Sequence, residues 1–237
     1  DSLEMLADRE KGNHELNAVM LAANGKTVVY RKFRGGYITN PKFGLKPGIY
    51  QVPAKGGKPK LITKSGVQPQ FADRNDRVYL MRYGKKPSLA RIDLDGQHDK
   101  KIYQGKYATE FRVSPDGKYL AFAERFKVFV TPLVERGDVI TVGPKASNLP
   151  VHKLSVRAGE NISWSAKSDE IYWSLGPDLY QAKIGSAFDI GSKADDKAEP
   201  KITSLGFERK TDKPKGLVAL VGGQVATMEG DKVIQDG

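Results

Sequence analysis

Short stretches in which apolar and polar residues alternate recur along the whole chain. Val28-Val29-Tyr30 and Ile49-Tyr50-Gln51-Val52 are two examples, rich in β-branched and aromatic residues. Such runs, about four to eight residues long and flanked by turn-forming residues, are typical of β-strands. No apolar stripe with the helical spacing of about 3.6 residues runs for ten residues, with the exception of residues 2–15, where Leu3, Met5 and Leu6 are compatible with one helical turn. The pattern therefore predicts a nearly all-β protein.

One segment of this pattern is repeated. Its clearest copy is Val113-Ser114-Pro115-Asp116-Gly117-Lys118, which leads into the strand-like segment 119–122. Proline presets φ, aspartate can bond to the backbone two residues on, and glycine adopts a positive φ, so the segment predicts a tight turn between two strands. Degenerate copies begin at Leu21, Phe71 and Trp164. The period is about 40 to 50 residues, which is the length of one blade of a repeat protein.

Further strand-like segments follow the turn in each period. They are residues 48–52, 60–63, 89–94, 101–103, 128–130 and 178–182. Four short strands in each period are the pattern of a β-propeller, whose blades are four-stranded sheets around a central channel. We therefore expect an all-β propeller with four-stranded blades, in an incomplete ring of about four to five blades whose missing members precede Asp1.

The residues of the repeat resemble a known family. The Ser114-Pro115-Asp116-Gly117-Lys118 turn, the Leu-Ala-Phe strand after it, the strand 49–52 with its Gly56-Gly57 turn, and the Trp164-Ser165 opening are similar to the TolB-type propeller repeat. The resemblance covers about residues 18–181. Two copies depart from the pattern, because 22–25 lacks the Ser-Pro-Asp core and 71–76 lacks the glycine. The resemblance implies a fold more than a function, since many functions share such propellers.

The end of the chain has a different pattern. A charged stretch, residues 208–216, reads as a domain boundary and precedes strand-like segments at 217–221 and 224–228, a turn at 229–231 and a return strand from Lys232. We predict a propeller domain over 1–213 and the first strands of a second domain over 214–237. The phrase Gly222-Gly223-Gln224-Val225-Ala226-Thr227-Met228, followed by Val233-Ile234-Gln235-Asp236-Gly237, resembles the opening of metal-dependent amidohydrolases, whose chains start with a small β-sandwich.

That second resemblance implies chemistry outside this chain. Amidohydrolases bind one or two divalent metals, such as zinc, through a His-x-His motif on the first barrel strand and further ligands from later strands. The three histidines here, His14, His98 and His152, are isolated, and the chain has no Cys. We therefore expect no catalytic, cofactor-binding or metal-binding residue in this chain. The aspartates at 73, 76, 93, 95 and 99 lack the spacing of a calcium loop and read as turn caps, and Trp164 and Trp173 read as core residues.

Positive charge is concentrated in one part of the chain. The net charge is +11, and no Asp or Glu occurs from Leu16 through Ala72. The basic block, residues 26–64, contains ten cations: Lys26, Arg31, Lys32, Arg34, Lys42, Lys46, Lys55, Lys58, Lys60 and Lys64. Five aromatic residues are interleaved with them: Tyr30, Phe33, Tyr37, Phe43 and Tyr50.

A basic block of this kind allows three interpretations. Cations with aromatics can bind nucleic acid, but the alternation in 28–30 and 49–52 favours aromatics that point inward beneath a solvated basic face. A contact with an acidic protein domain or a polyanion of the cell envelope is the intermediate alternative.

No apolar run approaches the roughly 20 residues of a membrane-spanning helix, so we expect no transmembrane segment.

The two resemblances together predict a function. We expect the chain to be the accessory propeller of a bacterial, periplasmic or secreted amidohydrolase that cleaves amide-type C–N bonds, with its own N-terminal blades and C-terminal catalytic domain as its partners. The alternative is a non-enzymatic TolB-like propeller that binds a protein or an envelope polymer. A propeller that gates a serine hydrolase is a third hypothesis, and it would require a Gly-x-Ser-x-Gly motif downstream.

Overall fold

The computed structural model describes residues 15–33, 46–184, 188, 199–213, 215–219 and 221–236. The chain divides into two compact units, Asp1–Leu205 and Gly206–Gly237. All regular elements in the described residues are β-strands. The described part of the chain contains no helix with the length and apolar character needed to cross a membrane.

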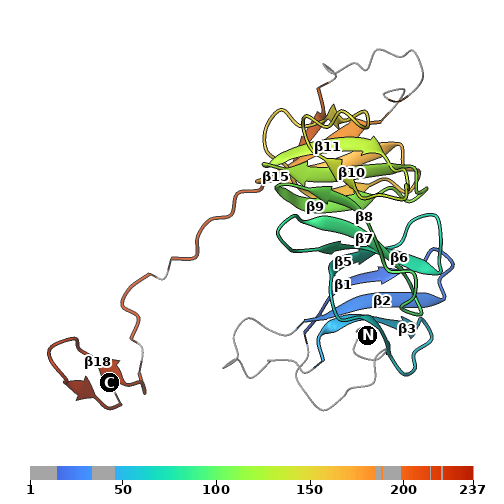
Figure 1. The fold of residues 1–237 in the computed structure, drawn as a ribbon. Helices are drawn as coiled ribbons and strands as arrows, with labels where there is room; N and C mark the ends of the chain where they lie inside the picture. Colours follow the sequence, from blue (N-terminus) through green and yellow to red (C-terminus); the bar gives the residue numbers. More distant parts are fainter. Residues whose placement is uncertain are drawn as a thin grey trace. The chain divides into compact units, whose positions relative to one another are not determined.

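The first unit is built from four sheets that follow one another along the chain, here called blades 1 to 4 (Figure 1). Blade 1 has the strand order β1 (Glu15–Leu21), β2 (Thr27–Phe33), β3 (Gly48–Pro53), β4 (Lys60–Thr63). Blade 2 has the order β5 (Val67–Gln70), β6 (Arg77–Arg82), β7 (Ser88–Asp93), β8 (Lys100–Gly105), β12 (Ile140–Val142). Blade 3 has the order β9 (Ala108–Val113), β10 (Tyr119–Glu124), β11 (Lys127–Pro132), β13 (His152–Lys153). Blade 4 has the order β14 (Glu160–Trp164), β15 (Glu170–Leu175), β16 (Asp178–Lys183), β17 (Lys201–Ser204).

This arrangement confirms the expected all-β propeller with four-stranded blades. One strand departs from the simple repeat. β12 follows β11 of blade 3 along the chain, but it pairs in parallel with β8 at the outer edge of blade 2. Blade 3 then gains its fourth strand from β13, which pairs with β11 through only two residue pairs, Phe129↔Lys153 and Val130↔His152. The sequence pattern does not signal this exchange, since a parallel partner requires no local turn.

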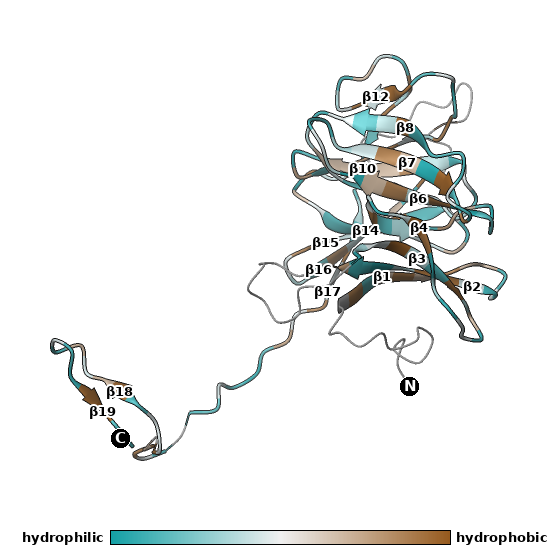
Figure 2. Ribbon diagram, turned by 60° about the horizontal axis from the view of Figure 1, so that its bottom comes forward, coloured by the Kyte–Doolittle hydropathy of each residue, from teal (hydrophilic) through white to brown (hydrophobic). Residues whose placement is uncertain are grey.

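Three clusters of the hydrophobic core lie between consecutive blades. In β6, Val78 and Leu80 face blade 1 while Tyr79 and Met81 face blade 3. Because both faces of a middle blade are covered, its strands are apolar at consecutive positions, as is usual for sheets buried on both sides. Figure 2 shows these hydrophobic stretches along strands such as β6 and β7, with a more hydrophilic β8 toward the edge.

The cluster between blades 3 and 4 explains why small residues alternate with large ones in blade 3. Ala121 and Ala123 of β10 face blade 4, where Trp173 is 1% exposed and stacks on Tyr180 with ring centroids 5.7 Å apart. The indole belongs to the same core cluster as these alanines, and a Cβ at Gly159 would lie only 2.5 Å from its Cδ1. Trp164 is half-buried, and its Nε1 donates a hydrogen bond of 3.0 Å to the carbonyl of Arg112. The structure therefore places both tryptophans in blade packing.

The predicted turn forms as the residue chemistry requires. Gly117 has φ 70°, and its N–H donates to the Ser114 carbonyl at 2.9 Å. The Ser114 hydroxyl donates to Asp116 Oδ1 at 2.6 Å and accepts the N–H of Tyr119 at 2.9 Å. The glycine also has a tertiary role, because a Cβ at Gly117 would lie 2.8 Å from Oδ1 of Asp73 in blade 2.

Side chains of the inner strands join blade 2 to blade 3 and blade 3 to blade 4. Gln70 of β5 donates from Nε2 to the Phe111 carbonyl of β9 at 3.0 Å and accepts the Val113 N–H on Oε1 at 2.8 Å. One blade later, Arg112 occupies the position of the repeat that Gln70 holds, and its Nε donates to the Ile162 carbonyl of β14 at 3.1 Å. The repeat therefore carries a polar link between blades 2 and 3 and again between blades 3 and 4.

The second unit contains one hairpin in its described residues, formed by β18 (Val225–Ala226) and β19 (Val233–Ile234). The predicted strands at 224–228 and from Lys232 are thus realised as two short strands. The strand expected at 217–221 is wrong for residues 217–219 and 221, which are not in a sheet. Leu217 and Val221 are almost fully exposed, and an apolar segment without a neighbouring strand has no partner for its backbone groups.

Candidate functional site

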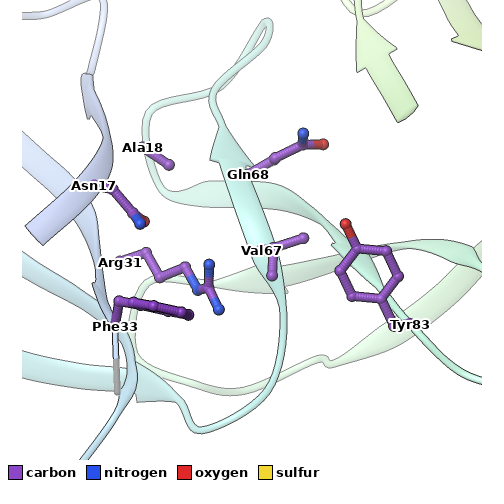
Figure 3. A pocket seen from close by; sticks show the side chains of 7 residues that line it. All are labelled: Asn17, Ala18, Arg31, Phe33, Val67, Gln68 and Tyr83. Carbon is purple, nitrogen blue, oxygen red and sulfur yellow. The ribbon is translucent and has the colours of Figure 1, made fainter. Parts of the chain in front are cut away.

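A cleft of about 470 Å³ lies where the inner strands of blades 1 and 2 meet. Its lining comes from four segments of these two blades: Asn17 and Ala18 of β1, Arg31 and Phe33 of β2, Val67 and Gln68 of β5, and Tyr83 just after β6. Figure 3 shows the Arg31 side chain extending from blade 1 toward Val67 and Tyr83 of blade 2. The volume falls in the range of small-molecule sites, about 300–1,000 Å³.

A bulge in each inner strand shapes this cleft. Between the pairs Asn17↔Arg31 and Met20↔Val29, β1 holds one residue more than β2, and β5 has the same irregularity between Val67 and Gln70. The extra residue places Ala18 at φ 50° and Gln68 at φ 52°. Non-glycine residues adopt this left-handed conformation at a cost of about 1–2 kcal/mol, and bulges of this kind re-aim neighbouring side chains.

The bulge is a property of the repeat as well as of this cleft. In β14, Asn161 stands at the position of Ala18 and Gln68, and it has φ 55°. In β9 the extra residue comes at Thr109, because Ala108 pairs with Glu124 and Glu110 with Ala123. Each of the four inner strands therefore has a register irregularity near its beginning.

The cation of the cleft is Arg31, which lies directly opposite Asn17 in the β1–β2 ladder. Its guanidinium carbon is 4.7 Å from the centroid of the Phe33 ring, a cation–π contact. Burial lowers the pKa of the Arg31 guanidinium, and the neighbouring Tyr83 acts in the opposite direction. The group remains positively charged at all physiological pH values. No carboxylate among the described residues forms an ion pair with it.

Two amide groups at the cleft have unused hydrogen-bonding capacity. Asn17 Oδ1 and Gln68 Oε1 are buried, and neither accepts a hydrogen bond within the part of the chain that the structure describes. Most buried polar side-chain atoms in proteins do have a partner. In Figure 3 the Asn17 amide lies on the side of Arg31, whereas the Gln68 amide extends away from it. Asn17 and Arg31 therefore form the polar centre, and Gln68 borders it.

A second buried polar group lies between blades 2 and 3. Glu124 is 4% exposed, and its Oε2 has no hydrogen-bond partner among the described residues. Desolvation raises the pKa of Glu124, against the lowering effects of the Tyr107 backbone N–H and of Arg125 and Lys106. Gly105 and Gly143 leave room for the carboxyl group, since a Cβ at Gly105 would lie 3.1 Å from its Oε2.

The candidate residues considered in the sequence analysis lie at separate places in the structure. Arg31 enters the cleft, Lys32 is buried in blade 1, and Tyr30 is 3% exposed on the same blade. The other cations of the basic block that the structure describes are exposed: Lys26, Lys46, Lys55, Lys58, Lys60 and Lys64. Four further residues of the block and its aromatics lie outside the described residues: Arg34, Tyr37, Lys42 and Phe43. His14 also lies outside them.

Several of the acidic side chains and one histidine considered above take part in local hydrogen bonds. Asp95 accepts the Gln97 N–H at 2.9 Å, Asp93 bonds to His98 Nδ1 at 2.8 Å, and Arg82 binds both oxygens of Asp99. The described residues contain no group of three or more His, Cys, Asp or Glu side chains that could hold a metal ion. The cleft between blades 1 and 2 is therefore a candidate binding site rather than a metal site.

Comparisons with solved structures agree on the fold. TolB from Acinetobacter baumannii is 17% identical, matches 70% of this chain and 40% of its own, and has a TM-score of 0.51. A gluconolactonase from Xanthomonas campestris is 13% identical over 75% of this chain and 59% of its own, with a TM-score of 0.53. An oligogalacturonate lyase in complex with manganese is 15% identical over 75% and 53%, with a TM-score of 0.50.

These similarities establish the fold, a β-propeller with four blades in the described residues, and TolB is among its structural neighbours. At 13–17% identity the likeness is one of fold. The chain spans between 40% and 59% of the length of these three proteins. No protein-family model matches the sequence. No curated protein matches it either.

Proposed function

We propose that this chain is the accessory propeller of a metal-dependent amidohydrolase that hydrolyses amide-type C–N bonds with metal-activated water. The observation that carries the proposal is the separate unit Gly206–Gly237, whose β18–β19 hairpin holds the residues that resemble the opening of that family. The catalytic residues and a divalent metal such as zinc belong to a barrel outside this chain. The propeller covers the mouth of that barrel or organises access to it.

The gene on both sides of this segment gives the first test. We expect additional blades to be encoded before Asp1 and a His-x-His motif to be encoded after Gly237, beyond one further sandwich hairpin and a strand. A stop codon near Gly237 would overturn the proposal. A Gly-x-Ser-x-Gly motif in place of His-x-His would assign the propeller to a serine hydrolase instead.

Activity of the full-length protein gives the second test. Hydrolysis of linear and cyclic amides should stop when a chelator removes the metal and return when Zn²⁺ or another divalent metal is restored, because the metal activates the attacking water. Hydrolysis that a chelator leaves unchanged, or no hydrolysis of any amide, would contradict the assignment. Fractionation of the source cells tests the expected periplasmic or secreted location.

The alternative function is a non-enzymatic propeller that binds an acidic protein or an envelope polyanion. Six exposed lysines on blade 1, Lys26, Lys46, Lys55, Lys58, Lys60 and Lys64, favour it, since none is paired with a carboxylate among the described residues. Binding of this kind should weaken steeply between about 50 and 200 mM salt. Gel-shift assays with single- and double-stranded probes at physiological salt should show no retention if nucleic acid is not the partner.

A further inference from the structure

The cleft between blades 1 and 2 contains polar groups that the chain itself leaves unmatched. Arg31 carries a half-buried positive charge at the cleft, and no carboxylate among the described residues is paired with it. Asn17 Oδ1, directly across the ladder, is buried without a hydrogen-bond donor in the same described part. An anion and an N–H donor, side by side, would satisfy both groups.

The other walls of the cleft narrow the chemistry further. Phe33 lies against the guanidinium, and Val67 lines the facing side from blade 2 (Figure 3). These two side chains offer apolar contact to a ligand of moderate size. Tyr83 is 70% exposed at the rim, where its hydroxyl can donate to an anionic oxygen. The cleft therefore suits a ligand with a carboxylate, an adjacent N–H and an apolar substituent.

We propose that this cleft binds the C-terminal residue of a peptide or an N-acylated amino acid. The guanidinium of Arg31 and the hydroxyl of Tyr83 hold the carboxylate, since guanidinium and carboxylate match in geometry and charge. The amide N–H of the same residue donates to Asn17 Oδ1. The apolar side chain of the ligand packs between Phe33 and Val67. A phosphate or an acidic sugar would satisfy the guanidinium, but neither brings the N–H donor that the Asn17 oxygen lacks.

This inference is independent of the proposed hydrolase, because it rests on residues of blades 1 and 2 alone. It does agree with that proposal in one respect, since products of peptide-like amide hydrolysis carry a free carboxylate. A failure of binding would remove the inference and would leave the hydrolase proposal, which depends on the sequence encoded after Gly237, untouched.

The test is calorimetric titration of the 237-residue chain with three matched probes. N-acetyl-leucine carries the carboxylate and the N–H, N-acetyl-leucinamide lacks the charge, and 4-methylpentanoate lacks the amide. We expect N-acetyl-leucine to bind at least about tenfold more tightly than N-acetyl-leucinamide, since a charge-assisted hydrogen-bonded pair is lost. We expect the affinity for N-acetyl-leucine to be about fivefold higher than that for 4-methylpentanoate, because the Asn17 oxygen stays unpaired when the ligand has no amide.

Variants of the cleft locate the binding. Arg31→Gln should weaken N-acetyl-leucine binding about tenfold or more, and Tyr83→Phe, at an exposed position that folding does not need, about threefold. Lys60→Gln removes an exposed charge of the same blade outside the cleft and should change the affinity less than about twofold. Equal affinity for the three probes, equal effects of Arg31→Gln and Lys60→Gln, or no binding by a folded chain would overturn the proposal.

Discussion

Gln70 offers a sharp test of how the blades are joined. Its side chain is 5% exposed and bonds both to the Phe111 carbonyl and to the Val113 N–H of the next blade. In Gln70→Leu the shape is nearly kept, but both backbone groups lose their partner while they remain buried. The variant therefore isolates the hydrogen bonds from the packing.

The expected loss of stability follows from the two backbone groups that lose their hydrogen-bond partner. Leaving a buried backbone donor or acceptor unpaired costs about 1–3 kcal/mol. The additional apolar burial of leucine offsets about 1 kcal/mol. The variant should thus be less stable by about 1–5 kcal/mol, a large part of the roughly 5–15 kcal/mol that is typical of a folded domain.

Urea unfolding measures this loss, followed by far-UV circular dichroism and by the fluorescence of Trp164 and Trp173. The midpoint should fall by about 1 M with an unchanged slope. Gln97→Leu, at an exposed glutamine whose side chain makes no hydrogen bond among the described residues, is the matched control and should stay within about 0.5 kcal/mol. A loss below about 1 kcal/mol for Gln70→Leu, or one equal to that of the control, would refute the link between blades 2 and 3.

Two further predictions concern a turn and a buried carboxyl group. Gly117→Ala should lower the free energy of unfolding in urea by about 1–3 kcal/mol, because φ is 70° and the new Cβ would meet Asp73. Gly137→Ala is the control and should leave the stability unchanged, because a Cβ there has open space around it. Equal losses in the two variants would contradict the close contact with Asp73. Desolvation raises the pKa of Glu124, so the folded chain holds a proton that the unfolded chain releases, and stability should fall as pH rises from about 4.3 through the folded pKa. Glu124→Gln should flatten that fall, and an unchanged pH profile would show that this carboxyl group does not cause it.

The burial of Glu124 shows one limit of prediction from sequence. The residue ends a strand beside Arg125 and Lys127, a pattern that indicates an exposed hairpin. The structure buries it, because β12 crosses to blade 2 and brings Gly143 next to its carboxyl group. That crossing joins segments about 40 residues apart in a parallel pair, and a parallel pair has no local sequence signal.

The cleft was only partly foreshadowed by the sequence. Arg31 and Phe33 share the alternation of Val29, which faces blade 2, so a cation on an inward-facing position was a signal that could have been read. Asn17 gave no such signal. Its face is set by the bulge at Ala18, and a one-residue change of register moves every following side chain to the other side of a strand.

The sequence by itself determined the strands, the turns and the period. Alternation set the strands, and Pro115, Asp116 and Gly117 set the turn, because both depend on backbone preferences within a few residues. The tertiary structure alone decided which blades exchange strands, which polar groups bridge them and which side chains meet in the cleft. Those outcomes depend on the packing of sheets and on bulge register, and both join residues that are distant in the sequence.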